Sequence, residues 1–72
     1  MDEEIRRGKY QHYKGNFYFV IDTAKHTETK EELVLYRSQD DLILWARPKR
    51  MFLENVVVNG KEVPRFRFIS YS

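Results

Sequence analysis

The side chains best suited to chemistry in this sequence are aromatic rings and cations in its second half. Aromatic faces beside guanidinium groups stack on nucleic-acid bases, and the same residue types form the hot spots of protein interfaces. The predicted binding residues are Tyr36, Trp45, Arg47, Lys49 and Arg65, with Arg50 and Phe66 nearby. We therefore predict a binding surface, either for a protein partner or for RNA or single-stranded DNA.

The same residues also have a structural interpretation. In that case Trp45 fills the core, and Arg47 and Arg65 form ion pairs with Glu32 or Glu54. For Trp45 the core role is favoured, because a domain of this size needs large apolar side chains inside. For the two arginines the sequence favours neither role.

Catalytic and metal-binding patterns are weak. His12, His26 and Glu28 carry groups that bind metals, but their spacing fits no compact metal motif. The sequence has no cysteine nucleophile and no G-x-S-x-G elbow, and its three glycines lie far apart, as turn residues do. We predict no enzymatic activity and no cofactor. A small metal-assisted hydrolase that uses these two histidines and Glu28 is the second alternative.

The composition indicates one small folded domain. The 72 residues include five Phe, five Tyr and one Trp, enough large side chains for a thin core. Thirteen basic and eleven acidic residues are interleaved, and the net charge of +2 is weaker than the surplus of a dedicated nucleic-acid binder. The lack of cysteine excludes a disulfide framework and a cysteine-based zinc site, and it fits a reducing compartment.

We expect the N-terminal segment to be neither a signal peptide nor a membrane anchor. Residues 1–7 are charged and precede no apolar run, and no stretch approaches the roughly 20 apolar residues that a membrane span needs. We predict a cytoplasmic protein without membrane contact. Residues 1–8 are predicted to form a flexible arm, and residues 9–72 a single β-barrel domain.

Short apolar runs separated by turn residues predict an all-β domain. A hairpin is expected over residues 9–24, with its turn at residues 14–16, where Gly15 and Asn16 tolerate positive φ. In the first strand, His12 is expected to pack beside Tyr10 and Tyr13. The polar residues 25–32 follow, and they predict a turn in which threonine oxygens accept hydrogen bonds from local N–H groups.

The second half continues the same pattern. Strands are predicted over residues 33–37 and 42–46, the latter stopped by Pro48. A single helical turn is predicted over residues 48–53. Val56, Val57 and Val58 then run into the hairpin signal Asn59-Gly60, with Pro64 at a strand edge or start, and residues 66–69 form the last strand. These elements predict a small barrel or sandwich.

Several ordered motifs agree with one known family. The matching stretches are residues 10–20, 24–29, 32–36, 45–48, 51–52 and 60–66. On these motifs the chain resembles a bacterial family of small proteins catalogued as domain of unknown function 1653. The resemblance implies a compact β-rich domain similar to SH3-type barrels, and it implies no activity. The family usually has an aromatic, Gly-containing loop where this chain has residues 38–43, so a site shaped by that loop would be altered here.

Together these observations predict a small SH3-like barrel of five or six short strands with one short helical turn. The predicted function is that of a non-enzymatic binding module, with a protein partner or self-association favoured and nucleic acid as the alternative. Phe17, Phe19 and Ile21 alternate with Tyr18 and Val20, so one of these two faces is expected to be partly exposed for interaction.

Overall fold

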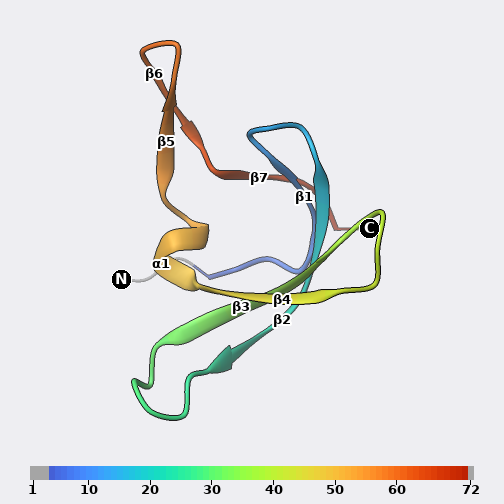
Figure 1. The fold of residues 1–72 in the computed structure, drawn as a ribbon, viewed down its shortest axis with the longest axis vertical. Helices are drawn as coiled ribbons and strands as arrows, with labels where there is room; N and C mark the ends of the chain where they lie inside the picture. The colour runs from blue at the N-terminus through green and yellow to red at the C-terminus, as the bar shows by residue number, and fades with distance from the viewer. Residues whose placement is uncertain (1–3, 72) are drawn as a thin grey trace.

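The computed structural model describes residues 4–71, which form two antiparallel sheets and one short helix (Figure 1). The larger sheet has five strands in the order β4-β3-β2-β1-β7, and the smaller one pairs β5 with β6. The elements are β1 (Gly8–His12), β2 (Phe17–Lys25), β3 (Glu32–Ser38), β4 (Leu44–Pro48), α1 (Lys49–Phe52), β5 (Asn55–Val58), β6 (Lys61–Pro64) and β7 (Phe66–Ser70). The all-β class with one short helical turn is thus confirmed, but residues 4–71 contain seven strands where five or six were predicted.

Both predicted hairpins form at their predicted turns. β1 and β2 are joined through Gly15, whose φ of 109° is accessible to glycine, and the Gly15 N–H donates to the carbonyl oxygen of His12 at 2.7 Å. β5 and β6 are joined through Asn59 and Gly60, which have φ values of 51° and 78°. Two consecutive positive φ values are the hairpin geometry that an Asn-Gly pair favours.

The connection between β2 and β3 is the predicted hydrogen-bonded turn. The N–H of Glu31 donates to Thr29 Oγ1 at 3.2 Å, and the N–H of Glu28 donates to His26 Nδ1 at 3.1 Å. Lys30 has a φ of 64° there. The imidazole of His26 therefore has a structural partner in the turn.

The strand predicted over residues 42–46 begins later, at Leu44. Leu42 and Ile43 lie in the preceding loop and are 87% and 53% exposed. The Asp41 carboxylate accepts a hydrogen bond from the Ile43 N–H at 2.9 Å, which holds the backbone in a turn. The strand also continues to Pro48 instead of ending at Ala46, so it has the predicted length but lies two residues further along the chain.

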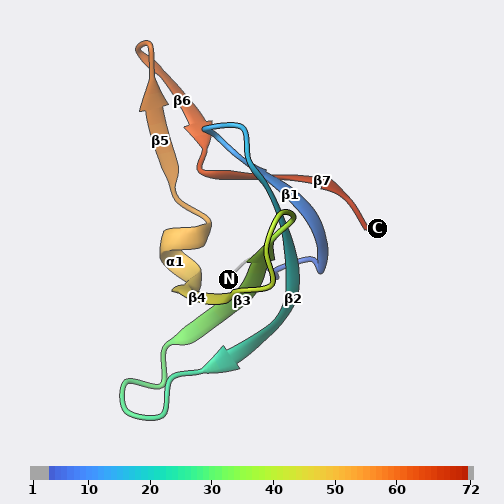
Figure 2. The same ribbon diagram turned by 45° about the vertical axis from the view of Figure 1, so that its right-hand side comes forward.

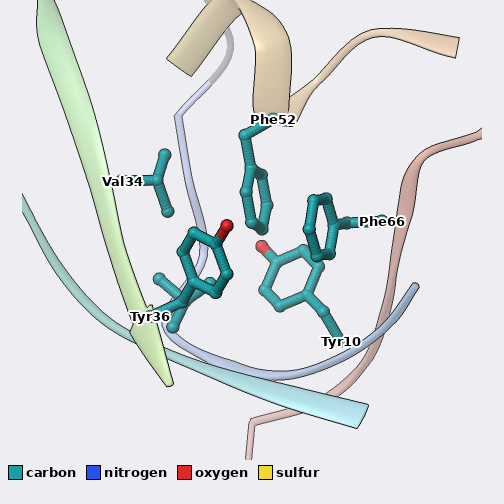
Figure 3. Close-up of a cluster of buried hydrophobic side chains, with 6 residues drawn as sticks. Tyr10, Val34, Tyr36, Phe52 and Phe66 are labelled. Carbon is teal, nitrogen blue, oxygen red and sulfur yellow. The ribbon is translucent and has the colours of Figure 1, made fainter. Parts of the chain in front are cut away.

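The core lies between the large sheet and α1. Its buried side chains are Tyr10, Val20, Val34, Tyr36, Phe52 and Phe66. Figure 3 shows Phe52 extending from the helix toward Tyr36, Tyr10 and Phe66. The rings of Phe52 and Phe66 stack with centroids 4.2 Å apart and planes 5° from parallel, so they join α1 to β7.

The large sheet is not closed into a barrel. β4 and β7 are its two edges and do not pair with each other among the described residues. The chain between them, α1 and the β5–β6 hairpin, lies across from β1 and β2 (Figures 1 and 2). The predicted SH3-like closure is therefore not found. The aromatic core and α1 cover the inner face of the sheet without an edge-to-edge ladder.

The core role favoured for Trp45 is wrong. This side chain is 48% exposed, whereas Tyr36, its partner across the strand pair, is buried. β4 is an edge strand, so Trp45 is covered by neighbours on one side only. Phe52, from the helical turn, fills the core in its place.

One face of the Phe17–Ile21 run is partly exposed, as expected. Phe17 and Phe19 are half-buried and Ile21 is 43% exposed, while Val20 is buried in the core. A register shift between Val20 and Asp22 leaves Ile21 without a partner in β3. That this face serves interaction stays a prediction.

The arm predicted over residues 1–8 lies partly outside the described residues. Within the described part, Arg6 lies over the ring of Phe68 at 3.9 Å, and its carbonyl oxygen accepts a hydrogen bond from Tyr10 Oη at 2.7 Å. Arg7 pairs with Asp22 at 2.9 Å. β1 then begins at Gly8.

Replacing Phe52 tests the role of this ring. Phe52→Ala is expected to lower the free energy of unfolding by about 3–5 kcal/mol, because a fully buried ring is lost and a cavity remains. Urea denaturation followed by far-UV circular dichroism measures this. Leu53→Ala is the matched control, since Leu53 is 37% exposed and should cost about 1 kcal/mol or less. Equal losses for the two variants would contradict the assignment of the core.

Candidate functional site: an aromatic cleft beside β4

A cleft of about 440 Å³ opens on the inner face of the large sheet, next to the core. Its aromatic and basic lining comes from all five strands of the large sheet, which contribute His12, Tyr18, Tyr36, Trp45, Arg47 and Phe66. It contains three of the five predicted binding residues. The structure therefore brings Tyr36, Trp45 and Arg47 together in one site.

Strand register explains why these residues share a face. Tyr36 pairs with Trp45 and Val34 pairs with Arg47 across β3 and β4. Because side chains alternate along a strand and directly paired residues point the same way, Trp45 and Arg47 lie on the face of Tyr36 and Val34. His12 is brought to this face by its pairing with Phe66 in β7.

Arg47 is the central cation of the cleft. Its Nε donates a hydrogen bond to Tyr36 Oη at 3.2 Å, and its guanidinium carbon lies 5.7 Å from the centre of the Phe66 ring. The side chain is half-buried. The ion pairs among residues 4–71 involve other cations, so Arg47 has no carboxylate partner there. Its two terminal nitrogens remain available to a ligand.

Lys49 and Arg65, the other two predicted residues, lie outside the cleft and have acidic partners. Lys49 Nζ is 3.5 Å from Glu32 Oε1, at the edge of a separate cavity of about 660 Å³. Arg65 Nη2 is 2.5 Å from Glu54 Oε1. The structural interpretation thus holds for Arg65, while Arg47 pairs with neither Glu32 nor Glu54. Buried Arg65 Nε has no hydrogen-bond partner among the residues that the structure describes.

His12 is a member of the site that the binding prediction missed. Its ring lies 4.5 Å from that of Tyr13, 4.9 Å from Phe66 and 6.2 Å from Tyr18, so the expected neighbour Tyr13 is confirmed. The N–H of Lys14 donates to His12 Nδ1 at 3.2 Å, which leaves the proton of the neutral ring on Nε2. The alternation in the first hairpin could have shown it, because Tyr10 and His12 share a face two residues apart.

The pKa of His12 is lowered from its ordinary value of 6.5. Burial is the main cause, because desolvation penalises the charged ring, and the nearby charges of Arg65, Arg47 and Lys14 add to it. His12 is therefore neutral at pH 7. It offers the cleft an uncharged N–H donor.

The three residues of the metal hypothesis do not assemble. His12 lies at the β1–β2 end of the hairpin and His26 in the β2–β3 turn, which are opposite ends of β2 (Figure 1). Among residues 4–71 no group of three or more His, Cys, Asp or Glu side chains could hold a metal ion. Residues 4–71 therefore contain no metal site of the kind that the metal-assisted hydrolase would need.

The loop between β3 and β4 adds an acidic rim. Asp40 and Asp41 line the cleft together with Asn16 and Ser38. Both aspartates are exposed, and the Ser38 hydroxyl accepts a hydrogen bond from the Asp40 N–H at 3.2 Å. This is the loop in which the chain departs from the pattern it resembles. The lining of the cleft therefore combines the cation of Arg47 with an acidic rim of two exposed carboxylates.

Comparison with known proteins identifies the family. Residues 8–68 match the family described as "Protein of unknown function (DUF1653)". This chain belongs to the DUF1653 family. A crystal structure of a DUF1653 protein from Bordetella bronchiseptica superimposes with a TM-score of 0.84 at 30% sequence identity, covering 96% of this chain and 92% of that one. No curated protein matches the sequence. DUF1653 membership thus confirms the resemblance and assigns no activity.

The helix content also bears on membrane insertion. Within residues 4–71, no helix of this DUF1653 protein is long and apolar enough to cross a bilayer.

The low pKa of His12 makes stability depend on pH. Since the folded state binds fewer protons than the unfolded state below about pH 6.5, the free energy of unfolding should fall as the pH drops below that value toward the lowered pKa. Urea denaturation at pH 7.5 and pH 5.0 measures this loss. His12→Gln should show a smaller loss between the two pH values. In an NMR titration, Arg47→Gln should raise the pKa of His12, because it removes a nearby positive charge. An unchanged pKa would contradict the proximity of Arg47 and His12.

The stabilities of Glu54→Gln and Arg47→Gln should distinguish a cation that is held by an ion pair from one that has no acidic partner. Glu54→Gln is expected to lower the free energy of unfolding by about 1–3 kcal/mol, because it leaves the charge of Arg65, whose side chain is only 23% exposed, without its partner. Arg47→Gln should cost about 1 kcal/mol or less, since it removes one hydrogen bond to a tyrosine hydroxyl. Thermal and urea denaturation of both variants test this ranking, and the reverse order would contradict it.

Proposed function

We propose that this DUF1653 protein is a non-enzymatic binding module that recognises a protein partner through the aromatic cleft. In this proposal Arg47 receives an acidic side chain of the partner, and Trp45 receives an apolar one. The observation that carries the proposal is the half-buried guanidinium of Arg47, which has aromatic neighbours and no acidic partner among the described residues.

The physical reason lies in the cost of an unpaired, partly desolvated charge. Burial of a cation is unfavourable unless hydrogen bonds or an anion compensate for the lost water. A carboxylate that docks on the two terminal nitrogens of Arg47 forms the bidentate pair that guanidinium groups prefer. Binding would therefore supply the compensation that the free domain lacks.

The aromatic residues of the cleft also support a protein partner. Trp45 stands 48% exposed beside the buried Tyr36, and hot spots of protein interfaces are enriched in Trp, Tyr and Arg. An exposed tryptophan next to a rigid wall presents a large contact area with little conformational entropy to lose. The hydroxyl of Ser38, which also lines the cleft, accepts a hydrogen bond from the Asp40 N–H and so has a structural role in the loop.

A nucleic-acid ligand is less well supported by the charges. Lys49 and Arg65, two of the three predicted cations, are paired with Glu32 and Glu54. Asp40 and Asp41 line the cleft, and their carboxylates would repel a backbone with one charge per nucleotide more than the single carboxylate proposed for Arg47. We place the protein in the cytoplasm as part of this proposal, and we favour a different protein chain over self-association. The absence of cysteine supports the reducing compartment.

Arg47→Ala is the direct test of recognition. Peptides selected from a random 12-residue phage library on the wild-type domain should be rich in acidic and aromatic residues. Binding of a selected peptide should weaken about 10- to 100-fold in Arg47→Ala, because hydrogen bonds to a charged group are lost. Since Trp45 is the only tryptophan of the chain, its fluorescence reports the titration from within the cleft, provided that the peptide contains none.

Arg37→Ala is the matched control. Arg37 neighbours Tyr36 in β3, so it lies on the opposite face of the sheet, and it is exposed. This variant should bind as the wild type does. Equal losses in the two variants, or tight binding of a mixed-sequence 20-nucleotide RNA at low salt with no selected peptide, would overturn the proposed protein partner.

A further inference from the structure

The strand β4, which lines the cleft with Trp45 and Arg47, has a free edge. β4 is the terminal strand of the five-stranded sheet, and no other strand among residues 4–71 pairs with its second side. Leu44, Trp45 and Ala46 are exposed there, with Leu44 at 58% and Trp45 at 48%. An edge strand presents unpaired backbone N–H and C=O groups that can template a further strand.

We infer that the partner binds as an extended segment that adds a strand to β4, with an acidic side chain opposite Arg47 and an apolar or aromatic one opposite Trp45. This inference rests on the proposed function and specifies how the partner is held. Strand addition supplies affinity through the backbone, while pockets for alternate side chains supply specificity. Here the cleft is the pocket for alternate side chains.

The spacing of the recognised side chains follows from β4 itself. Trp45 and Arg47 are two residues apart and point to the cleft, whereas Ala46 between them points to the other face. Side chains directly opposite each other on neighbouring strands lie about 4.5–5.5 Å apart at Cβ. The partner's acidic and apolar residues must therefore also be two apart.

The direction of the added strand gives the order of the motif. Antiparallel pairing is slightly more stable per residue than parallel pairing. In an antiparallel segment the residue opposite Arg47 precedes the residue opposite Trp45, so the motif is acidic-x-aromatic. Pro48, which has no N–H, marks one end of the ladder, and the acidic rim at Asp40 and Asp41 lies at the cleft's loop side.

Charge complementarity favours a different chain over a second copy. If β4 paired with β4 of another copy around Ala46, Arg47 would face Trp45 of that copy and would still have no carboxylate. Each copy would also bring its own net charge of +2. An acidic segment supplies a carboxylate for Arg47 and backbone hydrogen-bond partners for the free edge of β4.

Synthetic heptapeptides with Glu and Phe two residues apart test this inference. In 15N-HSQC titrations they should bind at least tenfold more tightly than peptides of the same composition with Glu and Phe one or three residues apart. Methylation of single backbone nitrogens of the peptide should weaken binding about tenfold at every second position and leave the positions between unchanged, because only alternate N–H groups face β4.

The results distinguish strand addition to β4 from binding in the cleft alone. A peptide that needs Arg47 but tolerates backbone methylation everywhere would overturn strand addition and leave the cleft as the binding site. A failure of every acidic-aromatic peptide, with Arg47→Ala equal to the wild type, would overturn the proposed function itself. A concentration-dependent dimer in analytical ultracentrifugation that Ala46→Glu dissociates would show that a second copy occupies the edge, and would overturn the inferred partner.

Discussion

The stacking of Phe52 on Phe66 holds together parts of the chain that are otherwise only loosely connected. A helix of four residues has no stability of its own, so α1 persists because its one buried side chain is fixed against the sheet. The same contact ties α1 to β7, which lies at the far edge of the sheet from β4. Phe52 also contacts the rings of Tyr10 and Tyr36, so this one side chain joins the helix to β1, β3 and β7.

The binding cleft depends on the same rings. Phe66 and Tyr36 are core residues that also line the cleft, so each contributes one side to packing and another to the site. Arg47 is positioned by a hydrogen bond to one of them and lies near the ring of the other. A site built on packed strands keeps its geometry better than one built on loops. The proposed recognition of a carboxylate therefore relies on a rigid wall.

The sequence was informative where structure is determined locally. Gly15 and the pair Asn59-Gly60 predicted both hairpins, because positive φ is a property of those residues themselves. It was not informative about which arginine meets a carboxylate. Arg65 and Arg47 look alike in the sequence, and only the long-range register places one beside Glu54 and the other beside Tyr36. The exposure of Trp45 and the open sheet depend on the same non-local pairing.

The pairing of β1 with β7 has a consequence for how the protein is made. These strands come from residues 8–12 and 66–70, yet Tyr10 lies opposite Phe68 and His12 opposite Phe66. During vectorial synthesis the ribosome exposes Tyr10 and Tyr18 long before Phe52 and Phe66 exist to cover them. The nascent chain must therefore hold its aromatic residues in water, or in a chaperone, until the last strand has emerged from the exit tunnel.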